Sequence, residues 1–141
     1  MKILALDLGD KWVGTAISDA LKITCKPYKT IELQDIKEEL EKIFDSTTIE
    51  TIVIGYPKTK SGTESDQTKK VVKQKEELEQ HFKSLSDLKW VLWDERLSSK
   101  RAEQRLPGKD FKQERLKSHS IAAAFILQSY LDHLSIHKNL T

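Results

Sequence analysis

The first third of the chain consists of short apolar runs separated by turn-forming residues. Residues 2–8 and 12–18 are apolar and strand-like, and a Gly-Asp-Lys turn at residues 9–11 separates them. This arrangement predicts a β-hairpin. A third extended run spans residues 22–31. Within it, Pro27 indicates an irregular or edge strand, because proline has no N–H to donate to a neighbouring strand.

Beyond residue 33 the apolar positions alternate between helical and strand-like spacing. Apolar residues three or four apart predict helices over 34–45, 67–82 and 119–134. Short continuous apolar runs predict buried strands over 51–57 and 89–95.

A further short, basic helix is expected after Ser98-Ser99, which can cap its N-terminus, and before Pro107-Gly108, which ends it. The predicted order is therefore β-β-β-α-β-α-β-α-α. We expect an α/β fold in which five strands form a mixed sheet. The first three strands are antiparallel, and helices cover both faces.

Length and composition limit the class of protein. A chain of 141 residues has the size of one domain, which we place at residues 1–141. The net charge of +2 does not by itself indicate a nucleic-acid-binding protein. The single Cys25 excludes an intramolecular disulfide and a cysteine-based zinc cage. Because the chain begins directly with a strand pattern and has no apolar run of about 20 residues, we expect a cytoplasmic protein that does not enter a membrane.

Basic residues concentrate in two segments despite the near-neutral balance. One segment spans residues 58–75 and the other spans residues 100–117. Each segment is either a solvated helix face or a surface that binds phosphate groups. The sequence leaves both interpretations open.

One carboxylate, Asp7, interrupts an otherwise apolar strand. An unpaired buried charge is costly, so Asp7 lies at the strand's end, has a partner, or holds a cation. A second acidic pair, Asp94 and Glu95, ends the strand predicted over 89–95. Carboxylates on adjacent strand ends repel each other unless a cation lies between them, and oxygen ligands favour Mg²⁺ or Mn²⁺. The alternative is that these acids are surface residues or helix caps.

Glycines coincide with the same strand ends. Gly9 and Gly14 bracket the first hairpin, and Gly55 and Gly62 bracket the loop after the strand at 51–57. Glycine permits a tight turn and the close approach of a phosphate.

Four segments together resemble the motifs of the YqgF/RuvX family. These are LDLGDKWVGTAISD, VIGYPKTKSGTES, WDERLSS and HSIAAAFILQSYLD, and they extend over almost the whole chain. The resemblance implies a bacterial protein of RNase H-like fold, similar to Holliday junction resolvases and linked to maturation of the 5′ end of 16S ribosomal RNA.

The resemblance also implies roles for individual residues. Asp7 would be the first metal-binding acid, and Glu95 with Asp94 would form the second acidic position. Where relatives usually carry an aspartate before the last helix, this chain has His119. The implied catalytic residues are Asp7, Glu95, Asp94 and His119. Asp7, Glu95 and His119 would hold Mg²⁺ or Mn²⁺.

Residues of the loops around this site are candidates for binding nucleic acid. Arg96 is a fork-shaped phosphate donor, or alternatively the partner of a neighbouring acid. The full set of candidates is Gly9, Lys11, Lys58, Lys60, Thr63, Glu64, Arg96, Ser98, Ser99, Lys112 and Arg115.

His119 leaves the function open between two classes. As a substitute ligand it would weaken Mg²⁺ binding and favour Mn²⁺. As a replacement for the third acid, it would instead mark a protein that binds nucleic acid without cutting it. The leading hypothesis is a metal-dependent endonuclease for a ribosomal RNA precursor. The alternatives are a resolvase of branched DNA, which calls for a homodimer rather than a monomer, and a non-catalytic binding protein.

The three tryptophans complete the sequence-based expectations. Trp12, Trp90 and Trp93 all lie in or beside predicted strands. We expect them to belong to the core rather than to form platforms on which bases stack.

Overall fold

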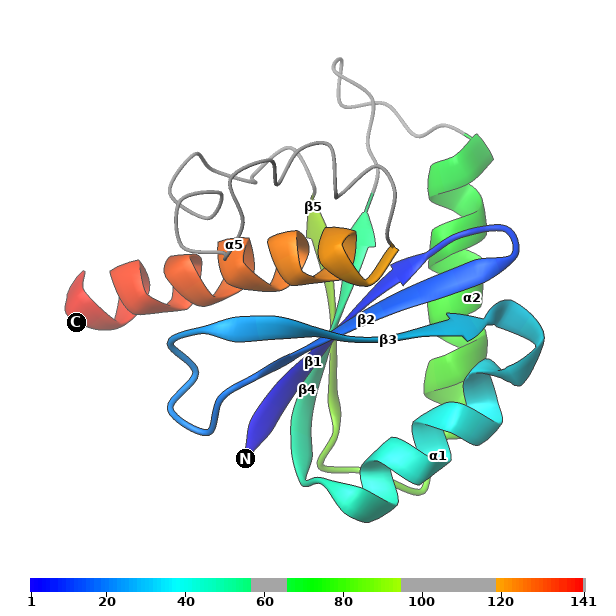
Figure 1. Ribbon diagram of the computed structural model, residues 1–141, viewed down its shortest axis with the longest axis horizontal. Coiled ribbons are helices and arrows are strands. Elements are labelled where there is room, and N and C mark those ends of the chain that lie inside the picture. The colour runs from blue at the N-terminus through cyan, green and yellow to red at the C-terminus, as the bar shows by residue number, and fades with distance from the viewer. Residues whose placement is uncertain (57–65, 95–118, 141) are drawn as a thin grey trace.

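The computed structural model describes residues 1–56, 66–94 and 119–140 (Figure 1). Its strands are β1 (Lys2–Leu8), β2 (Trp12–Ser18), β3 (Cys25–Glu32), β4 (Ile49–Tyr56) and β5 (Lys89–Asp94). Its helices are a single 3₁₀ turn η1 (Leu33–Asp35), α1 (Ile36–Ser46), α2 (Asp66–His81) and α5 (His119–Leu140).

The five strands form one mixed sheet in the order β3-β2-β1-β4-β5. β1 and β2 form the predicted antiparallel hairpin, and β3 pairs antiparallel with β2. β4 and β5 run parallel to β1 on its other side. The predicted α/β class, the five strands and the antiparallel arrangement of the first three are therefore confirmed.

The element boundaries differ from the predictions in small ways. The helix expected over 34–45 starts as the 3₁₀ turn η1 and becomes α-helical only at Ile36. The last helix continues past residue 134 to Leu140. The short helix expected after Ser98-Ser99 lies outside the described residues. No helix in the described ranges is long and apolar enough to cross a membrane.

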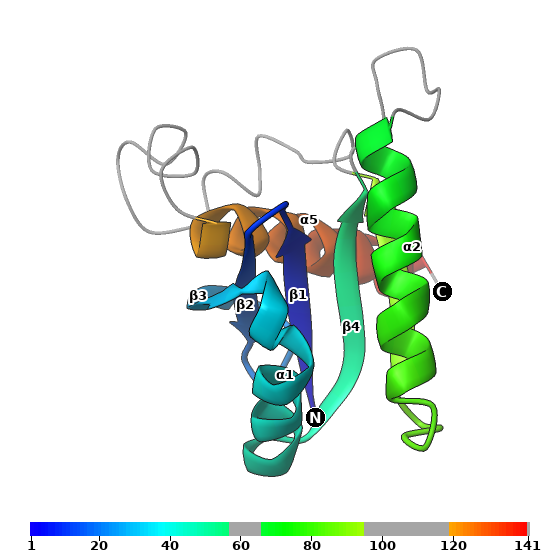
Figure 2. The ribbon, with the colours of Figure 1, turned by 90° about the vertical axis from the view of Figure 1, so that its right-hand side faces the viewer.

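Helices cover both faces of the sheet, as predicted (Figure 2). α5 packs on one face, where its buried side chains meet Ala5, Ala16 and Val53. α1 and α2 pack on the other face. We call these the α5 face and the α1/α2 face.

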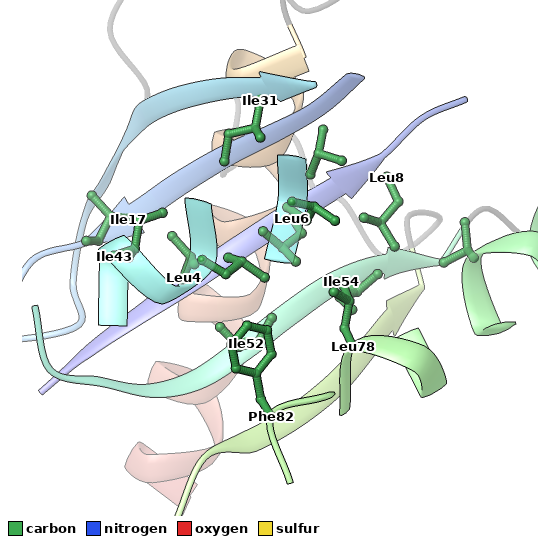
Figure 3. Close-up of a cluster of buried hydrophobic side chains, with 14 residues drawn as sticks. Leu4, Leu6, Leu8, Ile17, Ile31, Ile43, Ile52, Ile54, Leu78 and Phe82 are labelled. Carbon is green, nitrogen blue, oxygen red and sulfur yellow. The ribbon is translucent and has the colours of Figure 1, made fainter. Parts of the chain in front are cut away.

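The α1/α2 face holds a cluster of large aliphatic side chains (Figure 3). Leu4 and Leu6 of β1 and Ile52 and Ile54 of β4 are fully buried there. Each such side chain contributes roughly 1.5–3 kcal/mol relative to an exposed one. Residues with the opposite parity on these strands, such as Ala5 and Val53, face α5.

Pro27 lies in β3, which forms one edge of the sheet, so the expectation of an edge strand is confirmed. The pairing of β2 with β3 shifts register between Gly14 and Ala16. At the shift, the Thr15 hydroxyl accepts a hydrogen bond from Lys29 N and donates one to Lys29 O, both at 2.8 Å. This side chain replaces the missing backbone bonds of the ladder.

The tryptophans do not all belong to the core. Trp93 is buried and its indole N–H donates to Ser129 Oγ at 3.2 Å. Trp90 is half-buried and stacks near Phe82. Trp12 is 42% exposed, so its assignment to the core was wrong. Its place at the first position of β2, next to the hairpin turn, leaves it outside the layer that α5 covers.

Candidate active site

The carboxyl ends of β1, β4 and β5 lie at the same edge of the sheet, because these three strands are parallel. Asp7 is the last residue but one of β1. By strand alternation it shares the α5 face with Ile3 and Ala5. α5 begins at His119 above this strand end, and His119 Nδ1 lies 3.8 Å from Asp7 Oδ2. The structure thus brings together two of the predicted site residues from opposite ends of the chain.

Gly14 determines how closely α5 approaches the sheet. It pairs with Asp7 across the hairpin. A Cβ atom at position 14 would lie 1.8 Å from the carbonyl oxygen of His119 and 2.6 Å from the Ser120 nitrogen. Only a glycine leaves room for this backbone. The sequence suggested that Gly14 allows a phosphate to approach closely, whereas the structure shows that it leaves space for the first turn of α5.

Gly9 closes the hairpin beside the same histidine. Its N–H donates to Trp12 O at 2.9 Å. A Cβ atom at position 9 would lie 2.8 Å from Trp12 O and 3.6 Å from His119 Cε1. Gly9 is therefore needed for the tight turn, and Gly14 sets the distance between His119 and the sheet.

The electrostatic environment of Asp7 explains why a carboxylate is tolerated in an otherwise apolar strand. Its side chain is 24% exposed, and burial raises its pKa, while the nearby His119 opposes that rise. The 3.8 Å separation is within ion-pair range but longer than a hydrogen bond. Asp7 thus lies at a strand end, with a partner that only partly offsets the cost of its charge. A carboxylate in this state gains from a bound cation.

Asp94 is not brought to Asp7. It pairs with Tyr56 of β4, which separates β5 from β1. Trp93 belongs to the cluster on the α5 face, so alternation places Asp94 on the α1/α2 face. Asp7 and Asp94 therefore lie at the same edge of the sheet but on opposite faces.

Most of the other predicted residues lie outside the described part of the chain. Lys11 is exposed in the hairpin turn beside Gly9. The residues outside the described ranges are Lys58, Lys60, Thr63, Glu64, Glu95, Arg96, Ser98, Ser99, Lys112 and Arg115.

The donors available for a metal are one carboxylate and one imidazole. Within residues 1–56, 66–94 and 119–140, no three His, Cys, Asp or Glu side chains gather closely enough to hold an ion. Asp7 and His119 form a pair of the kind that accepts Mg²⁺ or Mn²⁺ when further oxygen ligands are added. Asp7 and His119 can therefore supply part of the ligand set of the predicted ion. The ion itself stays a prediction.

Sequence reasoning missed a cavity beside the hairpin turn. It has a volume of about 480 Å³. Its lining residues are Asp10, Lys11, Trp12, Glu32, Leu33 and Gln34. The signal in the sequence was Trp12 itself, because a large aromatic residue directly after a polar turn occupies the end of a strand, where cover is incomplete.

A solved structure agrees with this fold, and curated relatives agree with the family resemblance. The structure of Thermus thermophilus RuvC, described as "T. thermophilus RuvC in complex with Holliday junction substrate", matches with a TM-score of 0.61. The match covers 96% of each chain at 8% identity. The sheet order and its helices therefore define an RNase H-like fold.

The chain belongs to the family described as "RuvX: Holliday junction resolvase", whose profile matches residues 1–133. A Caldicellulosiruptor bescii protein named "Putative pre-16S rRNA nuclease" is 43% identical over 94% of this chain and 96% of its own length. A Clostridium botulinum protein of the same name is 38% identical over 96% of this chain and 99% of its own. The sequence resemblance is confirmed.

Proposed function

We propose that this protein is a metal-dependent endonuclease that acts on the 5′ end of the 16S ribosomal RNA precursor. The observation that carries the proposal is the half-buried carboxylate of Asp7 at a strand end, facing His119 at 3.8 Å. The names of the relatives, which describe nucleases of this precursor, also support the proposal. So does the family to which the chain belongs.

Asp7, Glu95 and His119 would hold the ion in this proposal. The family resemblance is the reason to prefer Glu95, and strand alternation argues against Asp94, because it places Asp94 on the face opposite Asp7. Asp94 then has a supporting role at the strand end. The ion would be Mg²⁺ or Mn²⁺.

Three features of the chain suit the site to binding a metal ion and a phosphodiester. Asp7 supplies negative charge in a partly desolvated position, and the Gly14 contact holds His119 beside it. Lys11, exposed in the adjacent turn, would neutralise a neighbouring phosphate. When bound, a divalent ion activates water and stabilises charge on the phosphate oxygens.

The proposal is tested by cleavage of precursor 16S RNA in Mg²⁺ or Mn²⁺. Asp7→Asn should lower the rate by about 10²–10³-fold, because losing a metal ligand removes several kcal/mol of transition-state stabilisation. Asp45→Asn is the matched control. Asp45 is an exposed acid near the end of α1, and this helix leads into the start of β4, away from the carboxyl ends of the parallel strands. Unchanged cleavage in Asp7→Asn would remove Asp7 from the chemistry.

Two other functions are separated in the same assay. The fold of RuvC and the family description favour a four-way DNA junction as a second substrate. Cleavage of the junction but not of the RNA would establish that function, and sedimentation should then show a dimer. His119 in the place of an acid favours binding without cutting. Cleavage by His119→Asp but not by the wild type would establish that case.

A further inference from the structure

Trp12 presents an aromatic side chain at the surface beside the candidate active site. It is 42% exposed, whereas Trp93 is 8% exposed. Its backbone is held firmly, because Trp12 O accepts from Gly9 N–H at 2.9 Å and Trp12 pairs with Glu32 of β3. The backbone of Trp12 is thus held in place, and its ring offers apolar surface on which another flat ring can stack.

The cavity next to Trp12 is open to solvent and has the size of a ligand pocket. Its volume of about 480 Å³ falls in the ~300–1,000 Å³ range of small-molecule sites. Glu32 Oε2 accepts a hydrogen bond from Gln34 Nε2 at 2.7 Å, which orients the carboxylate. Leu33 N–H donates to Lys11 O at 2.9 Å and ties the two walls together.

The cavity borders the face of the sheet that carries the candidate active site. Trp12 and Glu32 have the parity of that face, whereas Leu33 packs against the α1/α2 face. Asp7 pairs with Gly14, and Trp12 lies two residues before Gly14 in β2, on the same face by alternation. That spacing corresponds to about 7 Å along the strand. The hairpin tip, the end of β3 and the start of α5 also lie on the same side of the molecule (Figure 1). A nucleic-acid strand with a phosphate at Asp7 would therefore pass this cavity.

We propose that the cavity binds one unpaired nucleobase of the RNA strand that enters the active site. The base stacks on Trp12, Glu32 accepts hydrogen bonds from its edge, and Lys11 neutralises the adjoining phosphate. Bases are free to stack on a protein ring only where they are unpaired, so the cavity selects single-stranded RNA next to the cut. This inference rests on the proposed function for its choice of RNA as substrate.

Glu32 also predicts which base is preferred. An ionised carboxylate only accepts hydrogen bonds. Guanine offers two adjacent donors on its Watson–Crick edge. Uracil offers one N–H between two carbonyl oxygens that a carboxylate repels. We therefore expect guanine to bind best and uracil worst.

The test is metal-free binding of short RNAs to the full chain in EDTA, where no cleavage consumes the probe. The probes are a uridine-only RNA, the same RNA with one guanosine, and a fully paired duplex. Trp12→Ala should weaken single-strand binding about 5- to 150-fold, the range expected when one base loses its aromatic partner, and Trp12→Phe should restore most of it. Binding of the duplex should not change.

Three further measurements sharpen the result. Single-stranded RNA should quench the tryptophan fluorescence of the wild type, and Trp12→Phe should abolish the quenching. Glu32→Gln should remove the guanosine preference without removing binding. Leu21→Ala is the matched control and should bind like the wild type, because Leu21 is an exposed apolar residue in the turn between β2 and β3, at the other end of those strands.

The outcomes separate this inference from the proposed function. If Trp12→Ala binds single strands as tightly as the wild type, or if it weakens duplex binding equally, the cavity is not a base site. The same conclusion holds if the wild type binds none of the three RNAs. Loss of cleavage in Asp7→Asn would leave the proposed function intact in those cases. Trp12-dependent binding without any cleavage would support the base site and overturn the nuclease.

Discussion

The two faces of the sheet are built from different side chains, although β1 contributes to both. Toward α1 and α2 it presents large residues such as Leu4 and Leu6, which are fully buried. Toward α5 it presents one large residue, Ile3, and then, nearer the hairpin turn, Ala5 and Asp7. Large side chains hold a helix at a distance, whereas small ones let its backbone come close. On the α5 face this approach is so close that a carbonyl of α5 lies where Gly14 would carry a Cβ.

The two faces therefore have different roles: one contributes most to the stability of the fold, and the other positions the residues of the candidate active site. The α1/α2 face contributes apolar burial and contains none of the proposed metal ligands among the described residues. The α5 face contributes less aliphatic volume near the hairpin, but it fixes His119 over Asp7. Substitutions on the two faces should therefore have different signatures.

Leu6→Ala should produce the largest effect on stability. Leu6 is fully buried on the α1/α2 face, and a Leu→Ala change in a core costs about 2–5 kcal/mol. Cleavage per folded molecule should stay close to that of the wild type. Urea unfolding measures the first quantity, and cleavage corrected for the folded fraction measures the second. A large loss of corrected activity would show that the two faces are not separable.

Gly14→Ala should damage both stability and the site. The new methyl group meets backbone atoms that no rotamer change can move, so we expect a loss of about 1–3 kcal/mol. Displacing His119 by about 1 Å should also lower cleavage roughly 10²-fold. His119→Ala provides the comparison, since it removes the imidazole without crowding α5. If Gly14→Ala folded and cleaved normally, the close contact would not be what positions the histidine.

His119→Asp should change the response to metal. A second carboxylate beside Asp7 adds like-charge repulsion, so the melting temperature in EDTA should fall. An ion that binds only the folded state then stabilises it, by about 2.7 kcal/mol at a hundredfold excess over Kd. The rise in melting temperature on adding Mg²⁺ should exceed that of the wild type. Equal rises in both proteins would argue against a metal at this pair.

Asp7→Asn should produce the smallest change in stability, and its sign depends on pH. Burial raises the pKa of Asp7 above its ordinary value of 3.8. The folded state therefore holds the proton more tightly than the unfolded state, and the charged carboxylate disfavours folding at neutral pH. In EDTA, Asp7→Asn should melt at a higher temperature than the wild type at pH 7. The difference should vanish as the pH falls below about 3.8. A lower melting temperature at pH 7 would mean that His119 more than offsets the burial.

Much of the fold was predictable because it depends on local periodicity. The hairpin, the two parallel strands and the helices each carry their own spacing of apolar residues, and the structure follows it with end shifts of a few residues. Asp7 was identifiable for the same reason, since a carboxylate in an apolar run breaks the pattern. Its proximity to His119 was predicted only through the family resemblance, because 112 positions separate the two residues in the chain.

The sequence by itself therefore determined the elements of the described residues, their order and the unusual position of Asp7. The tertiary structure decided what covers each strand end. Alternation assigns residues to two faces, but only packing shows that α5 lies over Asp7 while Asp94 takes the other face. It also decided that Gly14 admits a helix and that Trp12 stays exposed. The physical reason is that burial of a strand-end residue depends on the neighbouring layer, which distant parts of the chain supply.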